Sequence, residues 1–300
     1  MSDTTTSTYI CRFCRLPSDA SGIACPKCGA PVDVTAVVSD SGWQEQPAIK
    51  DMARIQFGQS TCQIEGTYVP VVDFNLKGPE WVFFSHHSLL WREPSTQMQT
   101  MPMAGGWNRA RAGLPLVMLQ ASGPGHLALS DDAPGEVVAL PIAPGQAVQV
   151  REHRFLAATG NVSYDWQRAG IWFTTGTGDD TEYHHPLGVM VDRFHAQESP
   201  GLLLLHSPGN TFIRDLRQGE TICIQPSSFL YKDPTVGMAL HLEYPNQQGV
   251  SWSYSRRYQY RQVWLRMWGP GRVAVQSVFE RPETSEFITN SSAGTTKRQW

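Results

Sequence analysis

Gly123-Pro-Gly-His-Leu-Ala-Leu-Ser130 returns twice in altered form, as Ser199-Pro-Gly-Leu-Leu-Leu-Leu-His206 and as Gly269-Pro-Gly-Arg-Val-Ala-Val-Gln-Ser277. Each copy places a proline and a glycine before a short apolar run, which is typical of a β-strand that follows a tight turn. One such segment could arise by chance. Three segments of the same design indicate an internal repeat.

Further matches extend the repeat in both directions. Pro134-Gly135, Gly145 and Phe155-Leu156 return 74 residues later as Pro208-Gly209, Gly219 and Phe229-Leu230. A weaker first copy contains Leu89-Leu-Trp-Arg-Glu-Pro94, which resembles Phe229-Leu-Tyr-Lys-Asp-Pro234. The sequence therefore predicts a unit of roughly 70 residues that occurs about three times.

Short apolar runs bounded by glycine and proline predict strands, and no long segment has the period of a helix. Examples of the expected strands lie at 69–74, 81–84, 114–120, 127–130, 137–142, 147–150, 202–206, 221–224 and 272–278. We expect an all-β fold: a β-sandwich body of about three internal repeats with pseudo-threefold symmetry, preceded by a small zinc ribbon. The last Gly-Pro-Gly strand has no full unit after it. Closure, in which it pairs with strands near 54–85, would remove open sheet edges.

Four of the six cysteines form two Cys-x-x-Cys pairs, Cys11/Cys14 and Cys25/Cys28. Two such knuckles supply four thiolates at tetrahedral geometry, so we expect one structural zinc ion on these four cysteines. Iron in the same cage, two disulfides, or redox-active pairs are the alternatives. A module this short has no core, and the metal would supply its folding energy. Cys62 and Cys223 are expected to be plain buried thiols.

The predicted organisation is a zinc ribbon at 1–30, a linker at 31–51, the three-repeat body at 52–282 and a disordered tail at 283–300. The chain has 300 residues with 24 basic and 27 acidic side chains, a net charge of −3. This balance argues against a chain-wide nucleic-acid or membrane-surface binder. No transmembrane helix and no secretory signal are predicted, so we expect a cytoplasmic location.

No catalytic residue and no further cofactor site is expected in the body. The nine histidines lack the spacing of a cupin metal site, and the adjacent pairs His86-His87 and His184-His185 should point to opposite strand faces. Arg151-Glu-His-Arg154 is expected to be a salt-bridged strand end. Gly176-Thr-Gly-Asp-Asp180 fits a hairpin turn better than a phosphate loop.

The segment 251–272 carries five arginines, no acid and six interleaved aromatic residues. Such a pattern could hold single-stranded nucleic acid or anionic lipid head groups. The rings recur at even positions, however, which is the period of a half-buried strand pair. The structural interpretation is therefore preferred.

The body resembles the altered-inheritance-of-mitochondria family, member twenty-four. The resemblance covers about 52–280 and rests on Phe84–Trp91, Gly123–Ser130, Arg151–Leu156, Tyr231–Val236 and Gly269–Ser277, among other segments. It implies a body of three units similar to the tryptophan RNA-binding attenuation protein subunit, and it supplies no catalytic residues. The family's mitochondrial members are linked to inner-membrane organisation. The cysteine-rich N-terminus departs from the minimal family pattern and looks like a bacterial fusion.

Three functions fit these observations. The preferred one is a non-enzymatic interaction or scaffold protein, in which the β body self-associates or docks a protein partner. The second is a nucleic-acid-binding regulator that uses the zinc ribbon and the strands at 251–272. The third is a cupin-like metalloenzyme that uses body histidines. Peripheral membrane contact is left open.

Overall fold

The structure, a computed structural model, describes residues 8–10, 17–19, 26, 41–45, 53–101, 118–175, 182–196, 198–242 and 263–279. Its regular elements are β-strands and short 3-10 turns such as η2 (His86–Ser88) and η4 (Pro226–Ser228). No α-helix occurs in these ranges. The expected all-β fold is confirmed.

Three successive groups of six strands have one pairing scheme, and we call them units 1 to 3. In each unit the fifth strand pairs with the second and fourth, and the sixth pairs with the first and third. All of these pairings are antiparallel, and each sixth strand follows one of the proline–glycine turns. The repeated turns in the sequence thus mark equivalent places in the topology.

Six strands, numbered in chain order, make up each unit. Unit 1 consists of β6 (Val71–Leu76), β7 (Trp81–Ser85), β8 (Leu89–Arg92), β9 (Gln97–Thr100), β10 (Met118–Ser122) and β11 (Gly125–Leu129). Unit 2 consists of β12 (Glu136–Ile142), β13 (Ala147–Arg151), β14 (Phe155–Thr159), β15 (Val162–Arg168), β18 (Met190–Ala196) and β19 (Gly201–Ser207). Unit 3 consists of β20 (Thr211–Leu216), β21 (Thr221–Ile224), β22 (Phe229–Lys232), β23 (Gly237–Leu242), β24 (Val263–Trp268) and β25 (Gly271–Gln276).

The remaining strands are additions to this scheme. β4 (Ala53–Phe57) and β5 (Ser60–Glu65) form a hairpin that extends unit 1 beyond β6. β3 (Gln44–Glu45), within the expected linker, pairs with the outer edge of β20. β16 (Phe173–Thr175) and β17 (Glu182–His184) form an antiparallel hairpin inserted in unit 2, and β1 (Thr8–Ile10) pairs with β2 (Pro17–Asp19).

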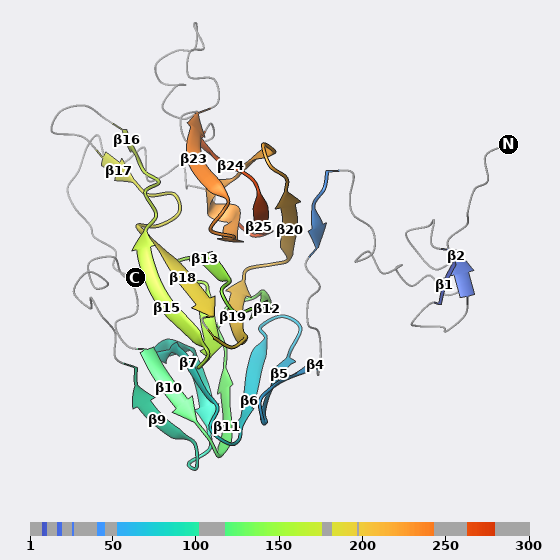
Figure 1. The fold of residues 1–300 in the computed structure, drawn as a ribbon, viewed down its shortest axis with the longest axis vertical. Helices are drawn as coiled ribbons and strands as arrows, with labels where there is room; N and C mark the ends of the chain where they lie inside the picture. Colours follow the sequence, from blue (N-terminus) through green and yellow to red (C-terminus); the bar gives the residue numbers. More distant parts are fainter. Residues whose placement is uncertain are drawn as a thin grey trace, which may run out of the picture.

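Neighbouring units share sheets. β14 of unit 2 pairs with β7 of unit 1, and β22 of unit 3 pairs with β13 of unit 2. Each junction therefore joins the third strand of one unit to the second strand of the unit before it. Figure 1 shows the result, with unit 1 in the lower part, unit 2 above it and unit 3 in the upper part.

Three hydrophobic clusters fill the spaces between successive sheets. We name them by the unit whose two sheet halves enclose them. The unit 1 core contains Phe74 and Phe84, the unit 2 core Phe83 and Phe194, and the unit 3 core Leu265 and Met267. Phe83 and Phe84 are adjacent on β7 and point to opposite faces, so this strand is buried on both sides.

The expectation of closure is wrong. β25, the last Gly-Pro-Gly strand, pairs with β20 and β22 inside unit 3, and not with strands near 54–85. The segment 53–65 instead folds on itself as the β4–β5 hairpin and pairs with β6. The units therefore form an open series. β8 and β21 each stand at the end of a sheet in the part of the chain that the structure describes.

Candidate interaction surface

β8 exposes apolar side chains that its counterparts bury. Leu90 is 56% exposed and Trp91 is 44% exposed. The matching residues of unit 3, Leu230 and Tyr231, are 0% and 2% exposed. In unit 2 the corresponding Leu156 and Ala157 are buried. The sequences are similarly apolar, so the difference comes from the neighbouring strand, which β14 and β22 have and β8 lacks.

The buried counterparts lie in the core of the preceding unit. Leu230 and Tyr231 of unit 3 belong to the unit 2 core, and Leu156 and Ala157 of unit 2 belong to the unit 1 core. The third strand thus supplies side chains to the unit before it. In the part of the chain that the structure describes, no unit precedes the one that holds Leu90 and Trp91. In units 2 and 3 the equivalent side chains pack against the preceding unit, whereas Leu90 and Trp91 have no such packing partner among the described residues.

β21 is the complementary open edge. It is the second strand of unit 3, and its Thr221 and Cys223 are exposed. The second strands of units 1 and 2, β7 and β13, are buried at every residue after the first. The prediction that Cys223 is buried is wrong for this reason, whereas Cys62 is buried as expected. Burial raises the pKa of the Cys62 thiol to about 12.

A cation follows the apolar pair in both β8 and β22. Lys232 Nζ donates to the carbonyls of Asp233 at 3.3 Å and Val236 at 2.6 Å. Arg92 Nη1 donates to the matching carbonyls of Glu93 at 3.4 Å and Thr96 at 3.1 Å. Lys232 is 4% exposed, and its burial lowers its pKa to about 8. Arg92 makes the same contacts in solvent, so the turn after β8 already has the form of its buried counterpart.

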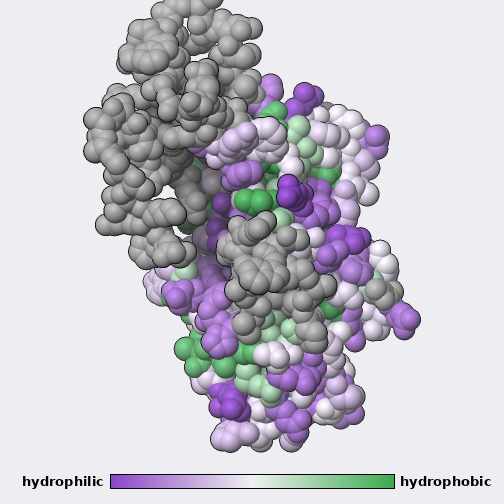
Figure 2. All heavy atoms as spheres, turned by 90° about the vertical axis from the view of Figure 1, so that its left-hand side faces the viewer, coloured by the Kyte–Doolittle hydropathy of each residue, from purple (hydrophilic) through white to green (hydrophobic). Residues whose placement is uncertain are grey.

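Figure 2 shows one face of the molecule, on which hydrophobic residues gather in the lower part among hydrophilic ones. That level corresponds to unit 1 in Figure 1. Apolar groups gathered on an otherwise polar surface are typical of a protein interaction site.

Two of the body histidines lie against carboxylates. His206 is 2% exposed, with Nδ1 at 2.6 Å from Asp131 Oδ2 and Nε2 at 3.1 Å from the Ala133 carbonyl. His126 Nδ1 lies 3.1 Å from Asp73 Oδ1. Within the described ranges no group of three or more His, Cys, Asp or Glu side chains is suited to hold a metal ion.

The expectation for the first adjacent histidine pair is wrong. His86 and His87 lie in η2 rather than on a strand, and both are exposed. In the second pair, His184 stacks on Phe173 with ring centroids 4.9 Å apart, and His185 is exposed. The Gly176–Asp180 segment lies outside the described residues, and the strands on either side of it, β16 and β17, pair in antiparallel fashion.

The Arg151–Arg154 cluster lies at the junctions between units. Arg151 donates through Nη1 to the Ser227 carbonyl of unit 3 and is buried. His153 has a positive φ of 61°. Its pKa is lowered, chiefly by burial and then by Arg154, His87 and Arg151. The segment thus connects unit 2 to unit 3 through Arg151, and Glu152 accepts a hydrogen bond from the Met190 backbone N–H; the expected salt bridge at this strand end stays a prediction.

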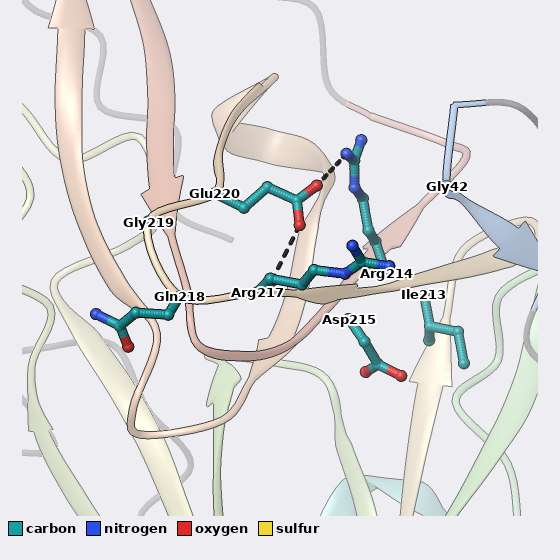
Figure 3. Close-up of a pocket in the computed structure, with 8 residues that line it drawn as sticks. All are labelled: Gly42, Ile213, Arg214, Asp215, Arg217, Gln218, Gly219 and Glu220. Carbon is teal, nitrogen blue, oxygen red and sulfur yellow. Dashed lines mark hydrogen bonds and ion pairs between the residues drawn. The ribbon is translucent and has the colours of Figure 1, made fainter.

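A pocket of about 670 Å³ lies at the turn between β20 and β21 (Figure 3), where Gly42 meets Arg214, Arg217 and Glu220. Three of its charged side chains, those of Arg214, Asp215 and Glu220, form ion pairs. Glu220 accepts from the Arg214 guanidinium and from the Arg217 backbone N–H, and these contacts lower its pKa. Asp215 forms two hydrogen bonds with Arg272, at 2.7 and 2.9 Å. These contacts stabilise the turn between β20 and β21, which is a structural role.

The aromatic and arginine-rich segment is described only from residue 263 onward. Leu265 and Met267 of β24 belong to the unit 3 core, and Val263 is buried on the same face. Trp264, Arg266 and Trp268 alternate with them on the outer face. The structural interpretation expected a half-buried strand, which β24 is. The buried positions are nevertheless the odd, aliphatic ones rather than the rings.

Cys11, Cys14, Cys25 and Cys28 lie outside the described residues, as do most of the expected linker and the whole expected tail. The zinc site therefore stays a prediction from the sequence. In the described residues no helix is long and apolar enough to cross a membrane.

The family model described as mitochondrial biogenesis AIM24 matches residues 62–278. The chain belongs to the AIM24 family. The match spans units 1 to 3, so the AIM24 region is the repeated β body. The family description gives no reaction and no ligand, so no site residue follows from membership.

A crystal structure of a Streptococcus pyogenes protein is similar to this AIM24 chain, with a TM-score of 0.54 and 20% sequence identity. The similarity covers 74% of this chain and 94% of that chain. At this identity the likeness concerns the fold alone. No curated protein matches the chain.

Proposed function

We propose that this AIM24 protein is a non-enzymatic scaffold whose β body joins copies of itself, with a small zinc module on Cys11, Cys14, Cys25 and Cys28 as an adaptor. The observation that carries the proposal is the exposure of Leu90 and Trp91, whose counterparts in units 2 and 3 are buried in the preceding unit. Large apolar side chains that fill a core elsewhere in the same molecule are suited to burial in an interface.

Support also comes from the polar groups. The charged residues around the β20–β21 pocket and the histidines at Asp73 and Asp131 are engaged in contacts that hold turns and strands together. Of the strands that stand at sheet ends, β8 is the one we assign to a partner, because it exposes Leu90 and Trp91 and its backbone groups can pair with another strand.

The test is the mass of the full chain in solution over a range of concentrations, measured by light scattering after gel filtration. We expect a mass above that of one chain, and the mass of one chain for Trp91→Asp. Trp172→Asp is the matched control, because Trp172 is 53% exposed but lies in the inserted hairpin region of unit 2. A single-chain mass for the unmodified protein at every concentration would overturn the proposal.

Nucleic-acid binding through β24 is the second candidate, favoured by exposed Arg266 between two outward tryptophans. The net charge of −3 weighs against it. Binding of a single-stranded oligonucleotide that weakens with salt and is lost in Arg266→Gln would support this candidate. No binding at low salt would exclude it.

A further inference from the structure

We propose that β8 of one copy pairs in antiparallel fashion with β21 of a second copy, so that unit 3 of one chain precedes unit 1 of the next. This inference rests on the proposed function, because it names the surface through which copies join. The β8 edge and the β21 edge are different surfaces of the chain, so a contact between them is head-to-tail.

The two junctions inside the chain are the template. At the first, Ala157 of β14 lies opposite Phe84 of β7 and Ala158 opposite Phe83. At the second, Val150 of β13 lies opposite Tyr231 of β22, and the register continues by one residue along both strands. Both junctions are antiparallel, and both join a third strand to the second strand of the preceding unit. Among the described strands, β8 is the third strand and β21 the second strand without such a neighbour.

Equivalent positions in the repeat predict the register of the proposed junction between β8 of one copy and β21 of the other. β8 corresponds to β22, so Trp91 takes the place of Tyr231 and Arg92 that of Lys232. β21 corresponds to β13 at a distance of 74 residues, so Ile224 takes the place of Val150 and Cys223 that of Gln149. Trp91 of one copy is thereby expected opposite Ile224 of the other, and Arg92 opposite Cys223.

The proposed contact would cover apolar side chains on both partners. Leu230 and Tyr231 reach the unit 2 core, to which Val148 and Val150 of β13 also belong. Leu90 and Trp91 would by the same geometry reach the unit 3 core beside Ile222 and Ile224 of β21. Ile222 is half-buried in the single chain and packs against that core, so it still has surface to bury.

One position makes this junction more polar than the internal ones. The residue paired with Leu204 in unit 2 is Ala139, and the residue paired with Ala274 in unit 3 is Ile213. The equivalent residue of unit 1 is Asp73, which pairs with Ala128 and contacts His126. Burying a carboxylate costs more free energy than burying an apolar side chain, so Asp73 should weaken the association of copies. We therefore expect the association to be reversible.

The register can be tested with a disulfide. Directly opposed residues of antiparallel strands have Cβ atoms about 4.5–5.5 Å apart, close enough for a disulfide after small adjustments. In the full chain, Arg92→Cys under mild oxidation is expected to give covalently linked copies on a non-reducing gel. Peptide mapping should identify the bond between position 92 and Cys223. Adding Cys223→Ser should abolish this bond, and Arg54→Cys, an exposed arginine on β4, should not form one with Cys223.

The outcomes separate this inference from the proposed function. A mass above one chain without the bond to Cys223 would overturn the head-to-tail register and leave self-association standing. A bond between two copies of position 92 that persists with Cys223→Ser would also overturn it, because it would mean that two β8 edges meet. A single-chain mass would overturn both proposals. Leu90→Asp provides a variant without a new thiol, and it should lose the assembly while retaining the circular dichroism of the unmodified chain.

Discussion

Leu90 and Trp91 have the residue types of a core and the exposure of a surface. Their type follows from their place in the repeat, since the third strand of each unit fills the core of the unit before it. Their exposure follows from the place of β8 at the end of its sheet, since no described unit precedes unit 1. Neither fact alone would single them out, because isolated exposed apolar residues are common on protein surfaces.

His153 should make the folded state sensitive to acid. Its pKa is lowered in the folded chain by burial and by Arg154, His87 and Arg151. Above pH 6.5, the ordinary value, the side chain is neutral in both states. As the pH falls through the range between that value and the lowered one, the unfolded chain gains the proton first and the folded chain loses stability.

The matched variant is His153→Asn, because asparagine accepts the positive φ of 61°. Urea unfolding between pH 7 and pH 5 should show a smaller loss of stability for this variant than for the unmodified chain. The difference should be modest, since the imidazole is only partly desolvated and the residue as a whole still contacts solvent. Equal losses in the two proteins would contradict the assignment.

At the scale of the element, the turns before β11, β19 and β25 determine where each sixth strand begins. Gly271 has a φ of +134°, and a Cβ there would lie 2.7 Å from Thr235 Oγ1 and 2.9 Å from Val236 Cγ2. Gly271→Ala should therefore cost about 1–3 kcal/mol of unfolding free energy.

Urea unfolding measures this cost, and Gly219→Asn is the comparison. Gly219 has a φ of +79° with nothing near its Cβ position, and asparagine tolerates such a backbone. A loss in Gly219→Asn as large as that in Gly271→Ala would contradict the role given to the close contacts.

The sequence predicted the elements unevenly. The apolar runs at 137–142, 147–150 and 221–224 match β12, β13 and β21 within one residue at each end. β18 was missed because its Met190–Ala196 carries Asp192, Arg193 and His195 among its apolar residues, which breaks the run. Partners of strands were harder to predict than strands, since pairing depends on residues far apart in the chain. The wrong closure of β25 onto 54–85 is an example.

At the scale of the whole molecule, the open edges could not be predicted from composition or from single motifs. The resemblance of Leu89–Pro94 to Phe229–Pro234 indicates that the two segments are equivalent in the repeat. Only the pairing scheme shows that it lacks the second strand that its counterparts have. The signal in the sequence is the order of the repeats, since the first unit of an open series has no unit before it.

The zinc module is expected to be independent of the β body. Native mass spectrometry of the full chain should find one zinc ion per chain. Cys11→Ser combined with Cys14→Ser should lose it, because two of four thiolate ligands are gone. Cys223→Ser should keep it. A metal ion that survives the double substitution would contradict the assignment and place the site elsewhere.

Hydrogen exchange of the β8 backbone amides tests the open end most directly. The full chain is to be compared at high concentration and after dilution, with the amides of β22 as the reference, because β22 is buried inside every copy. We predict slow exchange in β8 at high concentration and faster exchange on dilution, while β22 stays protected throughout. Fast exchange in β8 at every concentration, with β22 protected, would contradict the account, since the edge would then stay open when copies are free to meet.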